Sequence, residues 1–128
     1  MELVKQETKN GCGQAAVAMI LGISFQEACE LFGHAHGTQT KEVAKATKAH
    51  GWHCPSKLQR VSKKRAIPSF CIAKMKWDRN YSWHWVVVTG DIVWDPCYGK
   101  SSLKRYTKTG TTSFKGKITS FLPVRPPK

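Results

Sequence analysis

The most informative segment of the chain is Gln6-Glu7-Thr8-Lys9-Asn10-Gly11-Cys12-Gly13-Gln14-Ala15-Ala16-Val17-Ala18-Met19-Ile20. Its second half is rich in residues that favour a helix, and Gly22 follows closely enough to cap the end of that helix. The pair Asn10-Gly11 interrupts regular structure just before it. The segment therefore predicts a loop followed by an apolar helix, with Cys12 in the first helical turn.

Cys12 is the candidate nucleophile because of this position. The free N–H groups and the dipole at the start of a helix stabilise an anion, so we expect the thiol to ionise more readily than that of a free cysteine. A thiolate of this kind needs a neighbouring base to act in catalysis. Gln6 lies six residues upstream, where we expect its side-chain amide to offer a hydrogen-bond donor beside the sulfur.

The candidate base lies in the segment Trp83–Pro96, where two β-rich runs flank Thr89-Gly90-Asp91 and predict a tight hairpin. If Thr89 and Gly90 form the centre of the turn, His84 lies directly opposite Asp95. If Gly90 and Asp91 form the centre, Asp95 faces Val86, and His84 is its diagonal neighbour. Both registers place His84 and Asp95 on the same face of the sheet, because strand side chains alternate. Asp95 can then orient the imidazole of His84.

Four of these features together resemble a papain-like cysteine peptidase: Gln6, Cys12-Gly13 at a helix start, His84 at the start of a hydrophobic strand, and Asp95-Pro96. The chain is most similar to the bacteriocin-processing (double-glycine leader) peptidase family and its stand-alone relatives. The resemblance covers about Gln6 to Gly99 and implies a papain-like fold, a peptide or protein substrate and no cofactor. It also implies that Cys12 attacks, His84 is the base, Asp95 orients it and Gln6 contributes to the oxyanion hole.

The same resemblance has limits. The chain shows no membrane-spanning or ATPase segment of the kind found in transporters that carry such a domain, so a double-glycine preference is not implied. By analogy with papain-like clefts, we expect Trp83 and Tyr81 to line the substrate groove, with Gly11 beside the nucleophile as a third substrate-binding residue. Core packing is the alternative for the two aromatic residues, and we expect Trp85 and Trp94 to pack in the core.

The rest of the pattern predicts an α+β domain with helices first and an antiparallel sheet after them. Ser24 and Glu27 have the spacing of a capping box, and Thr38 or Thr40 is expected to cap a helix from Lys41 to His50. We expect the whole chain, 1–128, to form one domain with a mobile basic tail at about 123–128. Beyond the hairpin, the expected strands are Ile67–Met75 and Lys117–Pro123.

The net charge of +13 favours acidic partners, nucleic acid among them. A cluster of basic residues comprises Lys57, Arg60, Lys63, Lys64 and Arg65. The alternative interpretation is a solvated basic face, and no nucleic-acid motif is present. A second hypothesis for the whole chain follows: a catalytically inactive papain-like module that binds an acidic protein or nucleic acid through this surface.

The five cysteines form no disulfide framework, and their odd number indicates reduced thiols. Cys29 and Cys71 are expected to be buried as small apolar side chains. No metal site is predicted, because the spacing of the potential ligands matches no common zinc pattern; these ligands are His34, His36, His50, His53 and Cys54. The first residues show no signal pattern and no apolar run is long enough to span a membrane, so we expect a cytoplasmic protein.

Overall fold

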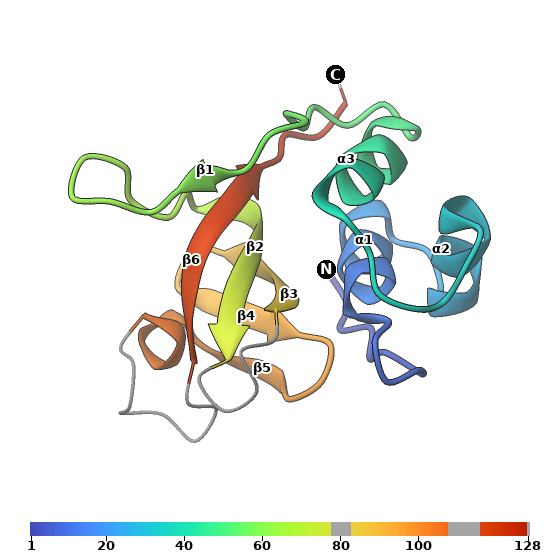
Figure 1. The fold of residues 1–128 in the computed structure, drawn as a ribbon, viewed down its shortest axis with the longest axis horizontal. Coiled ribbons are helices and arrows are strands. Elements are labelled where there is room, and N and C mark those ends of the chain that lie inside the picture. The colour runs from blue at the N-terminus through green and yellow to red at the C-terminus, as the bar shows by residue number, and fades with distance from the viewer. Residues whose placement is uncertain (78–82, 108–115, 128) are drawn as a thin grey trace.

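The computed structural model describes residues 1–77, 83–107 and 116–127. In this part of the chain, helices precede an antiparallel sheet with strand order β1-β6-β2-β3-β4-β5, so the predicted α+β class is confirmed (Figure 1). The elements are α1 (Cys12–Leu21), α2 (Phe25–Phe32), α3 (Thr40–Lys48), β1 (Gln59–Arg60), β2 (Phe70–Trp77), β3 (Trp83–Thr89), β4 (Ile92–Asp95), β5 (Gly99–Ser102), the short 3₁₀ helix η1 (Leu103–Tyr106) and β6 (Gly116–Pro123).

Helix α1 is the centre of the helical layer. It contacts α2 and α3 on one side and β3 on the other, and all its residues except Leu21 are buried (Figure 1). A helix that is apolar around its whole circumference is stable only when it is covered on every side. The predicted cap at Gly22 is confirmed, since this residue has a φ of 70° and its N–H donates to the Ala18 carbonyl.

Capping boxes stabilise the N-terminal turns of the two outer helices, α2 and α3. The predicted capping box of α2 is confirmed, with reciprocal hydrogen bonds between Ser24 and Glu27. The predicted helix α3 is present, but its predicted cap was wrong: Gln39 is the N-cap, and its N–H donates to the Glu42 carboxylate at 2.9 Å. Thr40 is already the first helical residue, and the helix ends at Lys48 rather than at His50.

The sheet carries an apolar layer on each face. Alternate residues of β3 divide between them: Trp85 and Val87 pack in the layer that includes α1, whereas Val86 and Val88 pack in the layer that includes Tyr106 from η1. The β3–β4 turn has Gly90 and Asp91 at its centre, because Thr89 pairs with Ile92 and Val87 with Trp94. Of the two registers considered, the second is therefore correct.

Part of the tail expected to be mobile is paired with the body of the protein. Val124 is buried, and Arg125 exchanges two backbone hydrogen bonds with His53, at 2.9 and 3.0 Å. Val124 and Arg125 are therefore held against the body of the protein, and a mobile tail beyond them stays a prediction. Within the described residues, no single helix is long and apolar enough to cross a membrane; α1 and α2 meet that test only as a pair, bent by 111°.

Candidate active site

Cys12 lies at the contact between the first helix and the sheet. It is the first residue of α1, as predicted, and Gly11 is the N-cap. The backbone N–H of Trp85 on β3 donates to the sulfur at 3.5 Å, and the residue is 9% exposed. The thiol therefore combines the electrostatics of a helix N-terminus with a donor from the sheet.

His84, on β3, lies next to Cys12 and connects it to Asp95. Its Nε2 donates to Asp95 Oδ1 at 2.6 Å, which leaves Nδ1 as the ring nitrogen for exchange with Cys12. Burial of this residue, which is 2% exposed, lowers the pKa of His84. Hydrogen bonds to Asp95 and Cys12 outweigh that effect and raise the pKa to about 9. The structure thus brings the three predicted residues together in the order Cys12, His84, Asp95.

Asp95 is completely buried, and protein donors satisfy both of its carboxylate oxygens. Oδ1 also accepts the backbone N–H groups of Cys97 and Tyr98, at 2.8 and 3.2 Å. Oδ2 accepts the hydroxyl of Tyr106 at 2.8 Å. Burial alone would raise the pKa of Asp95, but the hydrogen bond and charge of His84, followed by the other donors, lower it. The carboxylate is therefore held in its charged form.

Tyr106 is a site residue that the sequence analysis missed. It belongs to η1, and its side chain is fully buried behind Asp95. Burial, followed by the charge of Asp95, raises the pKa of Tyr106 above its ordinary value, so the phenol stays a donor. The surrounding residues show neither helical nor strand periodicity, and no local signal points to this role.

Gln6 lies beside the site, but its amide donors point to its own loop. Its backbone N–H donates to the Pro96 carbonyl at 3.0 Å, which ties this segment to the turn after Asp95. The side-chain Nε2 donates to the carbonyls of Thr8 and Lys9, at 3.0 and 2.8 Å. The Oε1 atom is buried and has no hydrogen-bond partner among the described residues. The role of Gln6 in an oxyanion hole stays a prediction.

The three residues expected to bind substrate have different positions. Gly11 fits closely against its neighbours: a Cβ atom there would lie 2.5 Å from Thr8 Oγ1 and 2.7 Å from Phe25 Cζ. Trp83 begins β3, directly before His84, and is 53% exposed. Tyr81 lies outside the residues that the structure describes. For all three, substrate contact stays a prediction.

No protein-family model matches this chain, and no curated protein matches it. The geometry of Cys12, His84 and Asp95 is therefore what indicates a function.

Two of the histidines considered as metal ligands, His34 and His36, have other contacts. His34 Nε2 pairs with the Glu42 carboxylate at 2.7 Å, and the His34 ring stacks on His36 with centroids 3.9 Å apart. Gln14 at the start of α1 donates to the carbonyls of both histidines, at 3.0 and 2.9 Å. Within the described ranges, no group of three or more metal-ligating side chains is arranged to hold an ion. This loop instead packs against the helix that carries Cys12.

The described cysteines are all free, and four of them differ from Cys12 in their surroundings. Cys54 and Cys71 are buried, and burial raises their pKa values to about 11 and about 12. Cys97 is exposed. Cys29 on α2 is half-buried rather than buried as expected.

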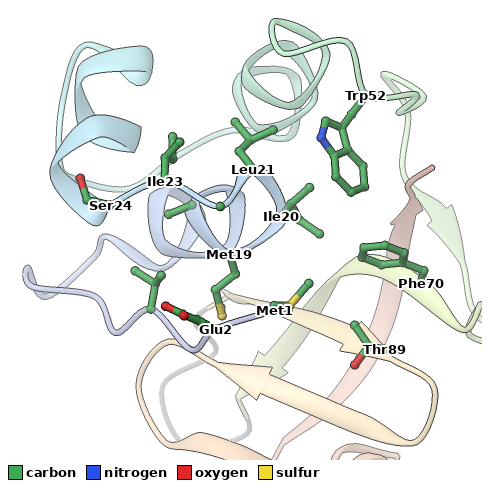
Figure 2. A pocket seen from close by; sticks show the side chains of 13 residues that line it. Met1, Glu2, Met19, Ile20, Leu21, Ile23, Ser24, Trp52, Phe70 and Thr89 are labelled. Carbon is green, nitrogen blue, oxygen red and sulfur yellow. The ribbon is translucent and has the colours of Figure 1, made fainter. Parts of the chain in front are cut away.

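A pocket of about 860 Å³ lies at the opposite end of α1 (Figure 2). Figure 2 shows Ile20 from that end of the helix pointing toward Trp52 and Phe70, whereas Met19 points toward Met1 and Glu2. A helix of ten residues is about 15 Å long, so this pocket is separated from Cys12 by the length of α1. None of the predicted site residues that the structure describes lines it.

Proposed function

We propose that this chain is a small cysteine peptidase with a papain-like fold, in which the nucleophile begins α1 and the base and its orienting carboxylate come from the sheet. The observation that carries the proposal is the position of His84. Its Nε2 is fixed by Asp95 at 2.6 Å, and its side chain also forms a hydrogen bond with Cys12. A nucleophile, a base and an oriented carboxylate in this order are the arrangement that covalent acyl transfer requires.

The first half of the reaction forms an acyl-enzyme. The Cys12 thiolate attacks the carbonyl carbon of the scissile amide, and the C=O electron pair moves to oxygen. Collapse of this tetrahedral species breaks the C–N bond, and the departing amine takes the proton that His84 carries. A pKa of about 9 keeps the imidazole of His84 protonated near neutral pH, so this proton is available.

The second half releases the acid. Neutral His84 takes a proton from water, and the resulting hydroxide attacks the thioester carbon. The C–S bond then breaks, the electron pair returns to Cys12 and His84 keeps the proton, which restores the starting state. In both halves, Asp95 stabilises the imidazolium through its hydrogen bond. The backbone N–H of Cys12 and the amide of Gln6 are the proposed donors to the oxyanion.

The substrate class is a peptide or protein. The same chemistry at Cys12 also performs deamidation or acyl transfer when the leaving group or the acceptor differs. The products distinguish these reactions: hydrolysis adds one water across a backbone amide and creates two new chain ends, whereas deamidation changes a side chain only.

A first experiment tests the thiol by itself. The purified protein is treated with iodoacetamide from pH 5 to pH 9, and alkylation is followed for each cysteine by mass spectrometry. Cys12 should react before Cys54 and Cys71, whose raised pKa values keep them protonated. The substitution His84→Gln should slow the alkylation of Cys12 and leave that of the other cysteines unchanged. A Cys12 that reacts no faster than the exposed Cys97, with or without His84, would contradict the proposal.

A second experiment tests the reaction. A synthetic library of unstructured peptides is incubated with the wild type, and new chain ends are identified by mass spectrometry. Cys12→Ala should abolish cleavage, whereas Cys29→Ser, which changes a half-buried thiol on α2, should preserve it. Cleavage that persists in Cys12→Ala would assign the activity to another site or to a contaminant.

One observation favours the alternative function of a binding module. The five basic residues of the cluster are all exposed, and they lie on and around β1, at the edge of the sheet (Figure 1). They are Lys57, Arg60, Lys63, Lys64 and Arg65. If binding is the function, replacing Lys63, Lys64 and Arg65 with Ser should abolish retention of an acidic protein or nucleic acid. Cys12→Ala should leave that retention unchanged.

A further inference from the structure

Lys74 is a cation on the strand next to the one that contacts the candidate nucleophile. It lies on β2 and is the cross-strand partner of Trp85, whose backbone N–H donates to the Cys12 sulfur. Paired residues of adjacent antiparallel strands have Cα atoms about 5 Å apart and side chains on the same face. Trp85 packs in the same apolar cluster as Cys12, so Lys74 projects on the face of the sheet where Cys12 lies.

Two indole rings hold the ammonium group of Lys74. Its Nζ lies 5.1 Å from the ring centroid of Trp83 and 5.3 Å from that of Trp85. Both distances are within the range of cation–π attraction. Trp85 is buried and Trp83 is 53% exposed, so the cation is fixed on one side and reachable on the other.

Among the residues that the structure describes, the Lys74 ammonium has no ion-pair partner. In the described parts of the protein, the ion pairs are His34–Glu42 and His84–Asp95, and Lys74 belongs to neither. Partial burial lowers the pKa of Lys74, while negative charge on Cys12 opposes that effect. Removing an ammonium from water without a carboxylate partner has a free-energy cost, which a bound anion would offset.

We propose that Lys74, flanked by Trp83 and Trp85, is a subsite for a carboxylate group of the substrate, next to the bond that Cys12 attacks. The inference rests on the proposed function, because it takes Cys12 as the nucleophile. It narrows the substrate class to peptides with a carboxylate near the scissile bond, supplied by an Asp or Glu side chain or by a free C-terminus. The exposed face of Trp83 packs against the methylene groups of such a residue.

The net charge of +13 is consistent with this substrate class, because a basic protein attracts acidic peptides from solution. A different role for Lys74 would be to stabilise the Cys12 thiolate itself. The two roles differ in what they require of the reagent. A carboxylate subsite accelerates reaction only with anionic reagents, whereas stabilisation of the thiolate affects neutral and anionic reagents equally.

The experiment compares alkylation of Cys12 by iodoacetate and iodoacetamide, which differ by a carboxylate in place of a neutral amide. The rate constants at Cys12 are measured by mass spectrometry, and their ratio is compared between wild type and Lys74→Met. We expect the ratio to fall about tenfold, the effect of losing a hydrogen bond to a charged group. Lys74→Arg should retain most of the ratio.

Lys100→Met is the matched control. Lys100 also lies over an indole, with its Nζ 4.9 Å from the Trp94 centroid, but it is on β5, which β4 separates from β3. This variant should keep the wild-type ratio. An equal loss of both rates in Lys74→Met, or no change in the ratio, would overturn the proposal. Thermal unfolding of each variant verifies that it is folded.

Protection of wild-type Cys12 from iodoacetamide gives a test without any substitution and identifies the source of the carboxylate. Three peptides of otherwise equal sequence are compared: a blocked peptide amide with Glu, the same amide with Gln, and the Gln peptide with a free C-terminus. Protection by the Glu amide indicates a side-chain carboxylate, and protection by the free C-terminus indicates a terminal one. If neither protects better than the Gln amide, no carboxylate subsite exists.

Neither readout depends on turnover, so the two proposals fail separately. If the iodoacetate-to-iodoacetamide rate ratio depends on Lys74 but the protein cleaves no peptide, the subsite is supported and the peptidase function is contradicted. If Cys12 cleaves peptides with no preference for carboxylates, and Lys74→Met leaves the rate ratio unchanged, the subsite is contradicted and the peptidase function is supported.

Discussion

The hydroxyl of Tyr106 donates to Oδ2 of Asp95 at 2.8 Å, while His84 donates to the other oxygen, Oδ1, at 2.6 Å. The carboxylate is thus fixed from behind by a buried phenol and presents one oxygen to the imidazole. A buried carboxylate with a missing donor would gain rotational freedom and favour its protonated form. Tyr106 is therefore a positioning residue for His84, through Asp95.

Tyr106→Phe removes this donor while keeping the ring. We expect the free energy of unfolding at pH 7 to fall by about 1–3 kcal/mol, because Oδ2 stays buried without a partner. The pKa of Asp95 is lowered in the folded state, so its contribution to stability is present above its unfolded pKa and is lost as the pH falls. In the variant that loss should begin at a higher pH, as urea unfolding between pH 3 and pH 7 can measure.

Tyr98→Phe is the control for this variant. Tyr98 contacts Asp95 through its backbone N–H, which the substitution retains, and its side chain is half exposed. We expect a smaller change in stability and an acid transition like that of the wild type. An equal effect of the two substitutions would contradict a specific role for the Tyr106 hydroxyl. The dependence of kcat on pH gives a second test: the decrease of kcat at acid pH should shift in Tyr106→Phe, and an unshifted decrease would also contradict this role.

The raised pKa of His84 predicts a loss of stability at alkaline pH. Its folded value is about 9, against an ordinary value of 6.5. A group with a raised folded pKa contributes stability that is fully present below its unfolded pKa and is lost as the pH rises through its folded pKa. The free energy of unfolding should therefore decrease between about pH 6.5 and pH 9, by an amount on the order of a few kcal/mol.

His84→Gln should remove this part of the pH dependence, whereas His50→Gln, at an exposed position, should preserve it. Urea unfolding at half-unit intervals of pH measures both. A slope that persists unchanged in His84→Gln would show that another group titrates in this range and that the imidazole is not held as an ion pair.

Local sequence signals predicted the parts of the site that depend on periodicity. The start of α1 at Cys12 follows from Asn10-Gly11 and the apolar run, and the shared face of His84 and Asp95 follows from strand alternation. The choice between registers did not follow, because Thr89-Gly90-Asp91 fits two turns. The structure resolves it in favour of Gly90 and Asp91, which makes His84 and Asp95 diagonal neighbours.

The remaining parts depend on contacts between distant segments. Tyr106 reaches Asp95 only because β5 pairs with β4 and η1 then packs on the sheet, and no local pattern encodes that path. The position of Lys74 depends on the β2–β3 register, which two separate apolar runs do not specify. The direction of the Gln6 amide depends on the carbonyls of its own loop. Such contacts follow from tertiary packing rather than from residue spacing.

Gln6→Ala distinguishes a catalytic from a structural role of this amide. If Nε2 leaves the Thr8 and Lys9 carbonyls to stabilise the oxyanion, kcat should fall about 100- to 1,000-fold with little change in KM. If the amide only holds the loop, the free energy of unfolding should fall while kcat changes little. Steady-state kinetics on a cleaved peptide, together with urea unfolding, separates the two results. Glu7→Ala, at the exposed neighbouring position, is the control.

Gly11→Ala tests whether close packing before α1 sets the position of the nucleophile. The added methyl group would lie 2.5 Å from Thr8 Oγ1 and 2.7 Å from Phe25 Cζ, so the loop or the α2 ring must move. Overpacking of this kind typically costs about 1–3 kcal/mol, and the displaced turn should also slow alkylation of Cys12. Gly37→Ala is the matched control, because its added methyl group would meet nothing within 4 Å. It should leave both the thermal midpoint and the alkylation rate unchanged, and a Gly11→Ala protein that behaves the same way would show that the turn tolerates a side chain.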